Sequence, residues 1–510
     1  MSRPIASAAS VGFRSDRGPV LASLMLATSL VALDSTIIAT AVPSVVADLS
    51  GFDQFPWLFS AYLLAQAVTV PVYAKLADTF GRKPIMYVGI GLFLAGSVLC
   101  GFAWSMTALI VFRALQGLGA GAVQPMSMTI AGDIYTVAER AKAQGYLASV
   151  WGMSAVIGPL LGGVFSEYVS WRWIFFVNIP LCLVAWWMLR RSFHETQQPR
   201  RTHRIDVAGA ALLTAALTVL ILALLEGGQA WAWSSMTSWT MFTVVAVLLV
   251  AFVFVERRAP EPVLPLWVFR SRLITAAALV SLLVGAIVMG VTSYGPTYLQ
   301  DVLHHGPLAA GFALATMTIG WPIAASQSGR LYLRIGFRAT AVIGAVIAGG
   351  GATLLALLGA HSSIWQVAAV CFIVGAGMGL VASPTLIFAQ SSVGWSERGV
   401  VTGTTMFTRS MGSAVGVAVF GALANAIVSG AVTGGQAPDP VTLFQATHRV
   451  FVAVAVLVGL MLLGTLALPA GRGEDAPADV ERIADPGTGS RTETGDLGAI
   501  PEPRLASGDG

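Results

Sequence analysis

The stretch Ala74-Lys75-Leu76-Ala77-Asp78-Thr79-Phe80-Gly81-Arg82-Lys83 separates two long apolar runs, residues 57–73 and 84–104. Apolar runs of about 20 residues are long enough to cross a membrane as helices, so the stretch predicts a tight connection at one membrane face. Its lysines and arginine place that face in the cytoplasm, where basic residues accumulate. Asp78 lies four residues before Arg82 and can pair with it if the connection is helical. The alternative is an ordinary basic loop that only sets the topology.

The composition is that of a membrane protein. Of 510 residues, 56% are hydrophobic and 11% charged, and the mean hydropathy is +0.77. Spanning helices satisfy their own backbone hydrogen bonds in lipid, so we expect an all-α integral membrane protein. The net charge of +4 is explained by topology, and we expect no nucleic-acid partner. The cysteines are too scattered for a metal cluster or a disulfide framework. Because no nucleophile, base and metal ligands cluster in the sequence, we expect neither an enzyme nor a cofactor.

About fourteen apolar segments reach spanning length. We place them near residues 19–42, 55–74, 84–104, 107–131, 143–166, 173–190, 206–225, 238–255, 273–299, 307–328, 338–359, 364–388, 402–427 and 450–469. An even number puts both termini on one side of the membrane. The loops on that side carry nearly all loop lysines and arginines, whereas the opposite loops hold Arg172 and Arg449. This asymmetry predicts a multi-pass protein of the inner (plasma) membrane with both termini in the cytoplasm.

The chain divides into five predicted regions. They are a cytoplasmic N-terminus (1–18), an N-terminal six-helix half (19–190), a linker with two extra spanning helices (191–269), a C-terminal six-helix half (270–470) and a disordered cytoplasmic tail (471–510). Residues 329–338 weakly repeat residues 74–83, with Leu333 in the place of Asp78. Two related halves are typical of secondary transporters. The tail is too polar to fold alone, because it cannot bury enough apolar surface.

Asp34 lies inside the first predicted helix, where a carboxylate costs at least about 2.5–3.5 kcal/mol to insert. Arg113, in the fourth predicted helix, lies at a similar depth and is the expected partner. Asp34 is a candidate for proton coupling and for the substrate charge; the alternative is a purely structural partner for the arginine. A neighbouring arginine favours the charged carboxylate and burial disfavours it, so a proton site requires that balance to change between conformations.

A polar stripe marks one face of the fourth predicted helix. Gln116 and Gln124 lie three and eleven residues after Arg113, so all three share a face. We expect this face to line a central cavity. Other candidates for the cavity wall are Gln66, Tyr294 and Tyr298. The tyrosine rings can contact a cationic substrate, although anchoring at the membrane interface is the alternative.

The fifth predicted helix is rich in small residues. The relevant positions are Gly152, Gly158, Pro159, Gly162 and Gly163. Small residues let helices approach closely in lipid, and a proline inside a helix bends it. We expect Gly158-Pro159 to help this helix move, and the alternative is ordinary glycine-rich packing.

These segments resemble the major facilitator superfamily, and within it the fourteen-helix drug/proton antiporter family. Residues 74–83 match the superfamily signature Gly-x-Leu-x-Asp-x-x-Gly-Arg-Lys, with Ala74 in place of the leading glycine. The segments around Asp34, Arg113 and residues 171–180 also match in order. The fifth-helix motif Gly-x-x-x-Gly-Pro-x-x-Gly-Gly matches except for Ser154 at its first position. The resemblance covers about residues 19–470.

The resemblance implies export rather than uptake, because the fifth-helix motif is associated with antiport in that family. It also implies a cytoplasmic gate in which Asp78 and Arg82 interact with Asp133, at the end of the fourth helix. Gly81 and Lys83 belong to the same loop signature. Arg409, in the thirteenth predicted helix, is expected to be structural, reaching the cytoplasmic face or the gate.

The sequence therefore predicts a proton-coupled secondary active exporter of hydrophobic, cationic drugs or toxic compounds. Ion gradients would supply the energy, because no nucleotide-binding motif appears. The expected partners are protons, a small hydrophobic substrate and the lipid bilayer. The alternatives are an exporter of a lipid or an endogenous metabolite, an importer, or a non-transporting receptor or scaffold with the same fold.

Overall fold

The computed structural model describes residues 11–50, 57–195, 206–227, 230–259, 262, 264, 266–431 and 439–470. The predicted 471–510 tail, most of the 1–18 segment and residues 196–205 of the linker lie outside them. Within these ranges the secondary structure is helical, apart from one isolated bridge between Gly227 and Trp231.

The helices follow one another with short connections. The N-terminal part holds α1 (Gly18–Leu49), α2 (Trp57–Phe80), α3 (Arg82–Gly101), α4 (Met106–Ile134), α5 (Val137–Tyr168), α6 (Trp173–Phe176) and α7 (Asn178–Ser192). The middle part holds α8 (Val207–Glu226), α9 (Met236–Glu256) and η2 (Leu266–Phe269). The C-terminal part holds α10 (Arg272–Thr297), η3 (Tyr298–Val302), α11 (Pro307–Ile335), α12 (Phe337–Ala356), α13 (Ile364–Ser391), η4 (Trp395–Glu397), α14 (Arg398–Ala431) and α15 (Pro440–Leu466).

Fourteen helical segments of the described chain are long and apolar enough to cross a membrane, the sixth of them combining α6 and α7. The all-α class and the helix count predicted from the sequence are thereby confirmed. Several helices extend beyond their apolar runs. For example, α1 continues to Leu49 and α2 to Phe80, where the sequence predicted ends near residues 42 and 74. A helix can continue past the end of an apolar run, because its backbone hydrogen bonds form within the helix whether the side chains are polar or apolar.

The 74–83 stretch is helical on both sides of one glycine. α2 includes Lys75 and Asp78, and α3 begins at Arg82. Gly81 between them has φ 102°, a left-handed value that favours glycine. Gly336, between α11 and α12, has φ 88° at the corresponding position of the repeat. The two connections therefore share a backbone geometry although Leu333 replaces the aspartate.

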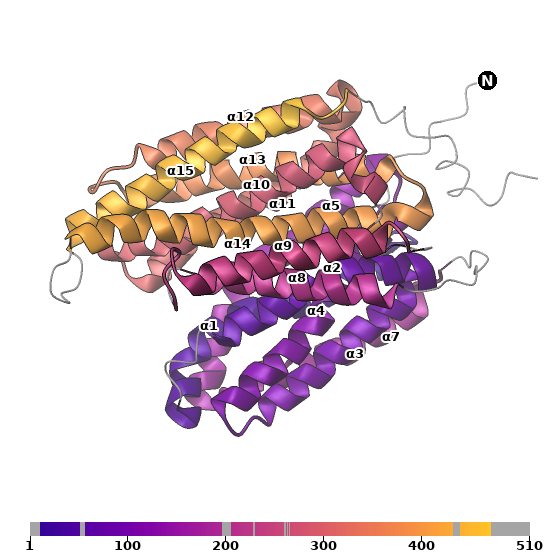
Figure 1. The fold of residues 1–510 in the computed structure, drawn as a ribbon, viewed down its shortest axis with the longest axis horizontal. Helices are drawn as coiled ribbons and strands as arrows, with labels where there is room; N and C mark the ends of the chain where they lie inside the picture. The colour runs from indigo at the N-terminus through magenta and orange to yellow at the C-terminus, as the bar shows by residue number, and fades with distance from the viewer. Residues whose placement is uncertain are drawn as a thin grey trace, which may run out of the picture.

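Two large buried clusters organise the bundle. One joins α1–α5 and α7 and includes Leu24, Ile90 and Phe93. The other joins α10–α15 and includes Val284 and Met378. In Figure 1 the indigo and purple helices and the orange and yellow helices form two groups that converge at one end of the molecule and diverge toward the other.

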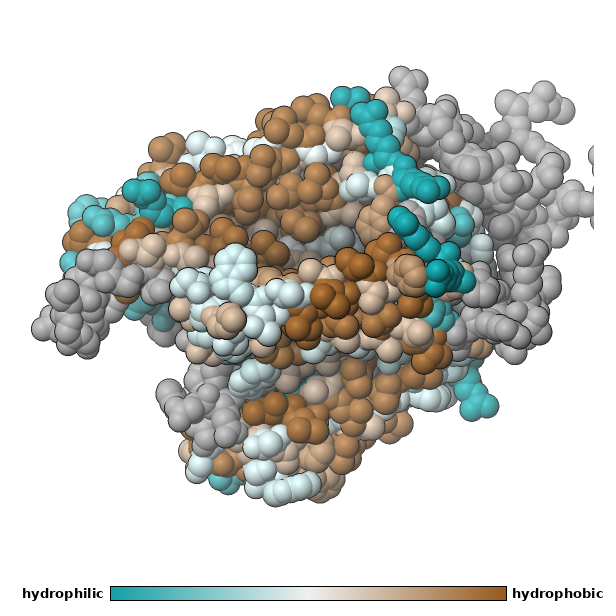
Figure 2. Space-filling model, in the orientation of Figure 1, coloured by the Kyte–Doolittle hydropathy of each residue, from teal (hydrophilic) through white to brown (hydrophobic). Residues whose placement is uncertain are grey.

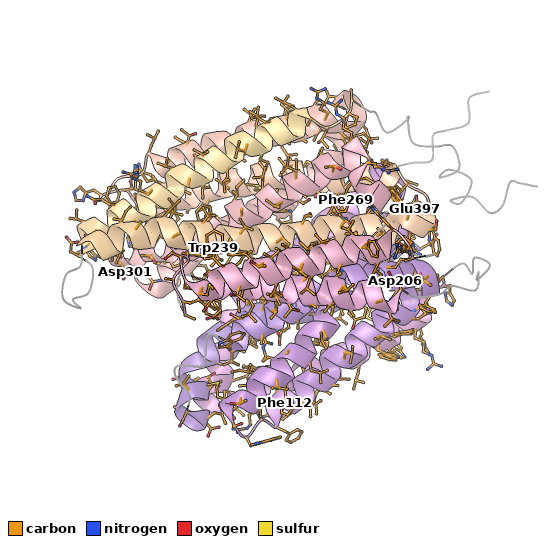
Figure 3. All side chains as sticks on the ribbon, viewed as in Figure 1. Phe112, Asp206, Trp239, Phe269, Asp301 and Glu397 are labelled. Atoms are coloured by element: carbon orange, nitrogen blue, oxygen red, sulfur yellow. The ribbon has the colours of Figure 1, made fainter. Side chains whose placement is uncertain are left out.

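The main contacts between the groups are those of α5 with α11 and of α2 with α14, and smaller contacts join α4 to α14 and α5 to α13. The extra helices α8 and α9 pack on each other, and α8 also contacts α2 and α14, so it covers one of these seams (Figure 1). We call the end of the bundle that holds Arg82 the Arg82 face, and the end that holds Asp48 the Asp48 face. Figure 3 shows Glu397, just before α14, near one end of the molecule and Asp301, after α10, at the other.

The outer surface suits a lipid environment. Figure 2 shows apolar residues over the middle of the visible face and hydrophilic residues gathered near its two ends. The helix α9 is the clearest case, because only 17% of its most apolar window is buried inside the protein. Its exposed side chains include Val247 and Val250, at 62% and 71% exposure. The chain is therefore a multi-pass membrane protein.

Glycines bring α14 against α10. A Cβ added at Gly412 would overlap the carbonyl oxygen of Leu282, and one added at Gly285 would overlap the carbonyl oxygen of Arg409. Close backbone approach of this kind is how small residues hold helices together in lipid. The position of α14 within the C-terminal group therefore depends on these glycines.

We expect Gly412→Ala to lower the free energy of unfolding by about 1–3 kcal/mol, because the added methyl forces α14 away from α10. The matched control is Gly350→Ala in α12, where a Cβ meets nothing within 4 Å. Thermal unfolding of the purified proteins in detergent would measure both. An unchanged melting temperature for Gly412→Ala would contradict the packing described.

Candidate functional site

Asp34 and Arg113 form a buried ion pair. Nη1 of Arg113 lies 2.5 Å from Oδ2 of Asp34, and each side chain is 1% exposed. Their helices α1 and α4 contact each other within the N-terminal group. Two opposite charges in a low-dielectric interior are tolerated when they pair and when further hydrogen bonds satisfy their remaining polar atoms.

Amides supply the further hydrogen bonds of Asp34. Gln116 donates from Nε2 to Oδ1 of Asp34 at 2.8 Å, and Asn178, at the start of α7, donates to the same oxygen at 3.4 Å. Both amides also donate to Oγ of Ser97, at 2.6 and 3.0 Å. The carboxylate is thus held by residues of α4 and α7 that share one serine of α3.

Arg113 has partners besides the aspartate. Its Nε donates to the carbonyl oxygen of Leu58 at 3.2 Å, and its Nη1 donates to Oε1 of Gln116 at 2.7 Å. The guanidinium carbon lies 4.2 Å from the ring centroid of Tyr62, a cation–π distance. These contacts hold the arginine in place beside Asp34.

The polar stripe of α4 is split between two environments. Arg113 and Gln116 are buried inside the N-terminal group, which differs from the cavity position expected for them. Gln124 is partly exposed, although every other residue of α4 from Gly119 to Gly132 is buried. Its Oε1 accepts a hydrogen bond from Nε2 of Gln66 at 3.3 Å, so two expected cavity residues lie together.

The two tyrosines expected in the cavity wall differ in burial. Tyr298 is buried, its hydroxyl donates to the carbonyl oxygen of Gly359 at 2.7 Å, and its ring packs edge-on against Phe451. The expectation for Tyr298 is therefore corrected: it packs inside the C-terminal group. Tyr294, one turn earlier in α10, is partly exposed.

Arg82 is the centre of a second ionic cluster, at the Arg82 face. Its Nη2 donates to Oδ1 of Asp78 at 2.7 Å, and its Nε lies 3.1 Å from Oδ2 of Asp133. The arginine is fully buried, and its guanidinium lies 3.5 Å from the ring centroid of Trp395. The structure thus brings together the three residues expected to form the gate.

The same cluster crosses to the C-terminal group. Asp78 accepts hydrogen bonds from the backbone N–H groups of Gly399 and Val400, at 3.0 and 2.8 Å. Arg398 donates from Nη1 to Oδ1 of Asp133 at 3.1 Å. These bonds join α2 and α4 to the first turn of α14, so the two groups are locked together at this face. The Asp78 carboxylate also lies at the N-terminus of α14, where the helix dipole stabilises a negative charge.

Glu195 stabilises the connection between α2 and α3. Its Oε1 accepts from the backbone N–H of Arg82 at 2.7 Å, and its Oε2 accepts from that of Lys83 at 3.2 Å. The Lys83 ammonium donates to the carbonyl oxygens of Arg190 and Phe193. A Cβ at Gly81 would lie 2.6 Å from Oε2 of Glu195, so a larger residue would have to displace this carboxylate in addition to adopting an unfavourable φ.

The glycines of α5 face different neighbours. A Cβ at Gly158 would overlap Thr36 of α1, and one at Gly152 would lie 3.1 Å from the carbonyl oxygen of Thr318 in α11. Gly162 is buried, whereas a Cβ at Gly163 would meet nothing within 4 Å. The side chain of Pro159 lies outside the described residues. The motif thus includes close contacts with both groups of helices.

A groove of about 710 Å³ follows the α5–α11 seam. Its walls include exposed apolar side chains, among them Met153 and Ile323 at 50% and 52% exposure, and Lys142 lies toward the Arg82 face. Because Arg140 and Gln144 occupy the opposite side of α5 and are buried, the groove opens on the outer surface of the bundle. Its volume falls in the range of pockets for small molecules.

The Asp48 face has a smaller ionic cluster. Arg172 donates to Oδ2 of Asp48 at 2.7 Å, and the indole N–H of Trp171 donates to the same oxygen at 3.1 Å. These hydrogen bonds, chiefly that from Arg172, lower the pKa of the Asp48 carboxyl. They join the end of α1 to the turn before α6, within the N-terminal group.

Several residues of these sites were not singled out from the sequence. Asn178 lies within the 171–180 segment that matched the family, but its role and that of Arg398 depend on long-range packing. Glu195, Trp395 and Ser97 gave no signal. Among the described residues, no group of three histidines, cysteines, aspartates or glutamates is placed to hold a metal ion.

The chain has the architecture of secondary transporters. It combines fourteen candidate spans, two helix groups joined by an ionic cluster, and an ion pair buried within the spans. Residues 24–417 match the model of the Major Facilitator Superfamily. The chain belongs to this superfamily, which confirms the resemblance seen in the sequence.

Similar proteins include transporters from bacteria and fungi. The chain is 35% identical to the multidrug transporter protein MdtP of Bacillus subtilis over 81% of its own length and 76% of that protein. It is 33% identical to multidrug resistance protein 3 of the same organism, over 86% and 88% of the two chains. It is 31% identical to the efflux pump FUS6 of Gibberella fujikuroi, over 80% and 75%.

A solved structure has the same fold. The human organic anion transporter MFSD10 superposes with a TM-score of 0.63, covering 88% of this chain and 99% of that one, at 14% sequence identity. The shared architecture supports the two-group arrangement described for this chain.

We expect Arg113→Met to destabilise the protein by about 3–5 kcal/mol, because it leaves the Asp34 carboxylate buried without its cation. The double variant Asp34→Leu/Arg113→Met removes both charges and should recover a large part of that loss. Thermal unfolding in detergent would measure the coupling. Strictly additive effects of Asp34→Leu and Arg113→Met would mean that the two side chains do not interact.

We expect Asp78→Asn to open the Arg82 face, because it weakens the bonds to Arg82, Gly399 and Val400. Spin labels at Thr79→Cys and Ser396→Cys, read by electron–electron double resonance, should show a longer distance population. Arg330→Ala, an exposed arginine bonded to Gln327, is the matched control and should leave the distances unchanged. Identical distance distributions for Asp78→Asn and the native protein would contradict a locking role.

Proposed function

We propose that this protein is a proton-coupled exporter of hydrophobic drugs or toxic compounds. The Asp34–Arg113 ion pair carries the proposal, because a paired charge buried within spanning helices is costly and marks an ion or proton pathway by default. Membership of the superfamily and the multidrug transporters and efflux pumps among its relatives support export of such compounds.

In this proposal Asp34 accepts the coupling proton. Protonation removes the negative charge that Arg113 faces and leaves the arginine its bonds to the Leu58 carbonyl and Gln116. The aspartate would then release Gln116 and Asn178, which tie α4 and α7 to α1. A protonation event would therefore loosen the packing between these helices and α1.

The cluster around Arg82 acts as the gate. It joins the two helix groups at one end, so it must break before that end can open. We place the Arg82 face in the cytoplasm, following the distribution of basic residues in the loops. On this assignment the structure has its cytoplasmic end closed, and alternating access requires rocking of one group against the other.

The substrate charge is a separate question from proton coupling. The expectation of a cationic substrate rested on Asp34, but in the structure this carboxylate is surrounded by Arg113, Gln116 and Asn178. Its negative charge is therefore already neutralised within the N-terminal group. Asp34 would therefore bind the coupling proton, and other residues would recognise the substrate.

We expect Asp34→Asn to abolish uphill dye transport, because asparagine keeps the size and one hydrogen-bond acceptor of the side chain but cannot exchange the proton. The measurement is flux of rhodamine 6G and doxorubicin in proteoliposomes with an imposed pH gradient. The gradient-driven component should fall to the level of protein-free vesicles. Exchange of dye without a gradient should persist, which shows that the variant is folded.

Gradient-driven flux that survives in Asp34→Asn would move proton coupling to another residue. Native protein that transports neither dye, with or without a gradient, would contradict the export of drugs and favour a lipid, an endogenous metabolite or a scaffold role. Asp48→Asn is a matched control, because it removes an aspartate from the exposed end of the same helix.

A further inference from the structure

Arg409 is a second arginine deep within a spanning helix, and it differs from Arg113 in having no partner among the described residues. Its guanidinium makes no ion pair and no hydrogen bond with any residue that the structure describes. Arg113, by contrast, is neutralised by Asp34. A cation in the membrane interior requires a counter-charge or a polar cavity, because transfer from water to a low dielectric penalises the charged form.

Arg409 lies on the face of α14 that turns toward the N-terminal group. Thr402, seven residues and two turns earlier, accepts a hydrogen bond from Gln390 of α13, whose amide also reaches the carbonyl oxygen of Met128 in α4. Met406, between them, belongs to the buried cluster of the N-terminal group. Arg409 is therefore about two turns from the Gln390–Thr402 contact, on the side of α14 that faces the N-terminal group rather than the lipid.

The Gln66–Gln124 pair lies at about the same depth. Arg409 is eleven residues from Arg398, Gln66 is twelve from Asp78, and Gln124 is nine from Asp133. At 1.5 Å per residue, all three side chains lie roughly 14–18 Å from the ionic cluster of the Arg82 face. The N-terminal group thus presents two amides at the level where the C-terminal group presents a cation.

The amides have hydrogen-bonding capacity to spare. Oε1 of Gln124 accepts from Gln66 at 3.3 Å, and the NH₂ group of Gln124 has no partner among the described residues. Both glutamines and Arg409 are partly exposed. An unpaired guanidinium and a free amide donor together provide N–H groups of the kind that carboxylate, sulfonate and phosphate oxygens accept.

The backbone of Arg409 is firmly held. Gly285 of α10 packs directly against its carbonyl oxygen, and Ser413 donates its hydroxyl to that oxygen and to the carbonyl of Gly285, at 3.2 Å each. The position of the side chain is therefore set by the α10–α14 packing. Because α14 also carries the turn that bonds Asp78, movement of the gate would move Arg409 relative to Gln66 and Gln124.

We propose that Arg409, with Gln66 and Gln124, forms an anion-binding subsite in the transport pathway, so that the substrates include amphipathic compounds bearing a carboxylate, sulfonate or phosphate group. The inference rests on the proposed transport function and names its substrate class. The anionic group supplies the counter-charge that none of the described residues supplies to Arg409. The two amides of the N-terminal group then bridge to the same anion, which couples its binding to the approach of the two groups.

The test uses two dyes that share a xanthene ring system, anionic fluorescein and cationic rhodamine 6G. Binding to the purified full-length protein in neutral detergent is followed by fluorescence anisotropy. We expect fluorescein to bind the native protein, with an affinity that falls about tenfold or more in Arg409→Gln. Arg409→Lys, which keeps the charge, should stay within about threefold of native, and Gln124→Leu should lose about threefold or more. Rhodamine 6G binding should be unchanged in all three.

Arg449→Gln is the matched control, because this arginine is exposed near the other end of the bundle and should leave both dyes unaffected. Thermal unfolding establishes that Arg409→Gln is folded. The inference is overturned if native protein does not bind fluorescein, if Arg409→Gln binds it as tightly as native, or if the variant loses both dyes equally. Binding needs no gradient, so this result is independent of the flux measurement on Asp34.

Discussion

The structure depends on how charges are neutralised away from water. Within the spanning helices, Asp34 and Arg113 form a pair that is 1% exposed on both sides and is completed by two amides and a serine. Breaking such a pair exposes an uncompensated charge to a low dielectric, which costs several kcal/mol. The pair therefore fixes how α1, α3, α4 and α7 pack, and a proton is the simplest agent that can alter it.

At the Arg82 face, ion pairs and hydrogen bonds also neutralise buried charges, but here they join the two groups of helices. Asp78 and Asp133 both pair with Arg82 of their own group. Across to the C-terminal group, Asp78 bonds the first turn of α14 and Asp133 bonds Arg398. Each aspartate is therefore shared between an internal and a crossing contact. Such sharing allows the crossing bonds to be exchanged for internal ones when the face opens, without leaving a buried carboxylate unpaired.

Arg409 is the exception to this pattern of internal neutralisation, and that is why it is informative. The helix that carries it also provides the crossing contacts with Asp78, and glycines fix its backbone against α10. Because no described residue pairs with this cation, an anionic substrate would bring its counter-charge from outside the chain. Proton coupling at Asp34 and substrate recognition at Arg409 would then be separate sites, one inside the N-terminal group and one between the groups.

The sequence by itself determined the membrane class, the fourteen spans and the family, because apolar run length and the spacing of short motifs are local properties. It also paired Asp34 with Arg113 and Asp78 with Arg82, from depth and from helical spacing. Only the tertiary structure decided that Gln116 and Tyr298 are buried, that Asn178 and Arg398 complete the ionic sites, and that Arg409 has no partner among the described residues. These facts depend on which helix faces meet and how far apart the two groups lie, and periodicity along one helix does not encode its neighbours.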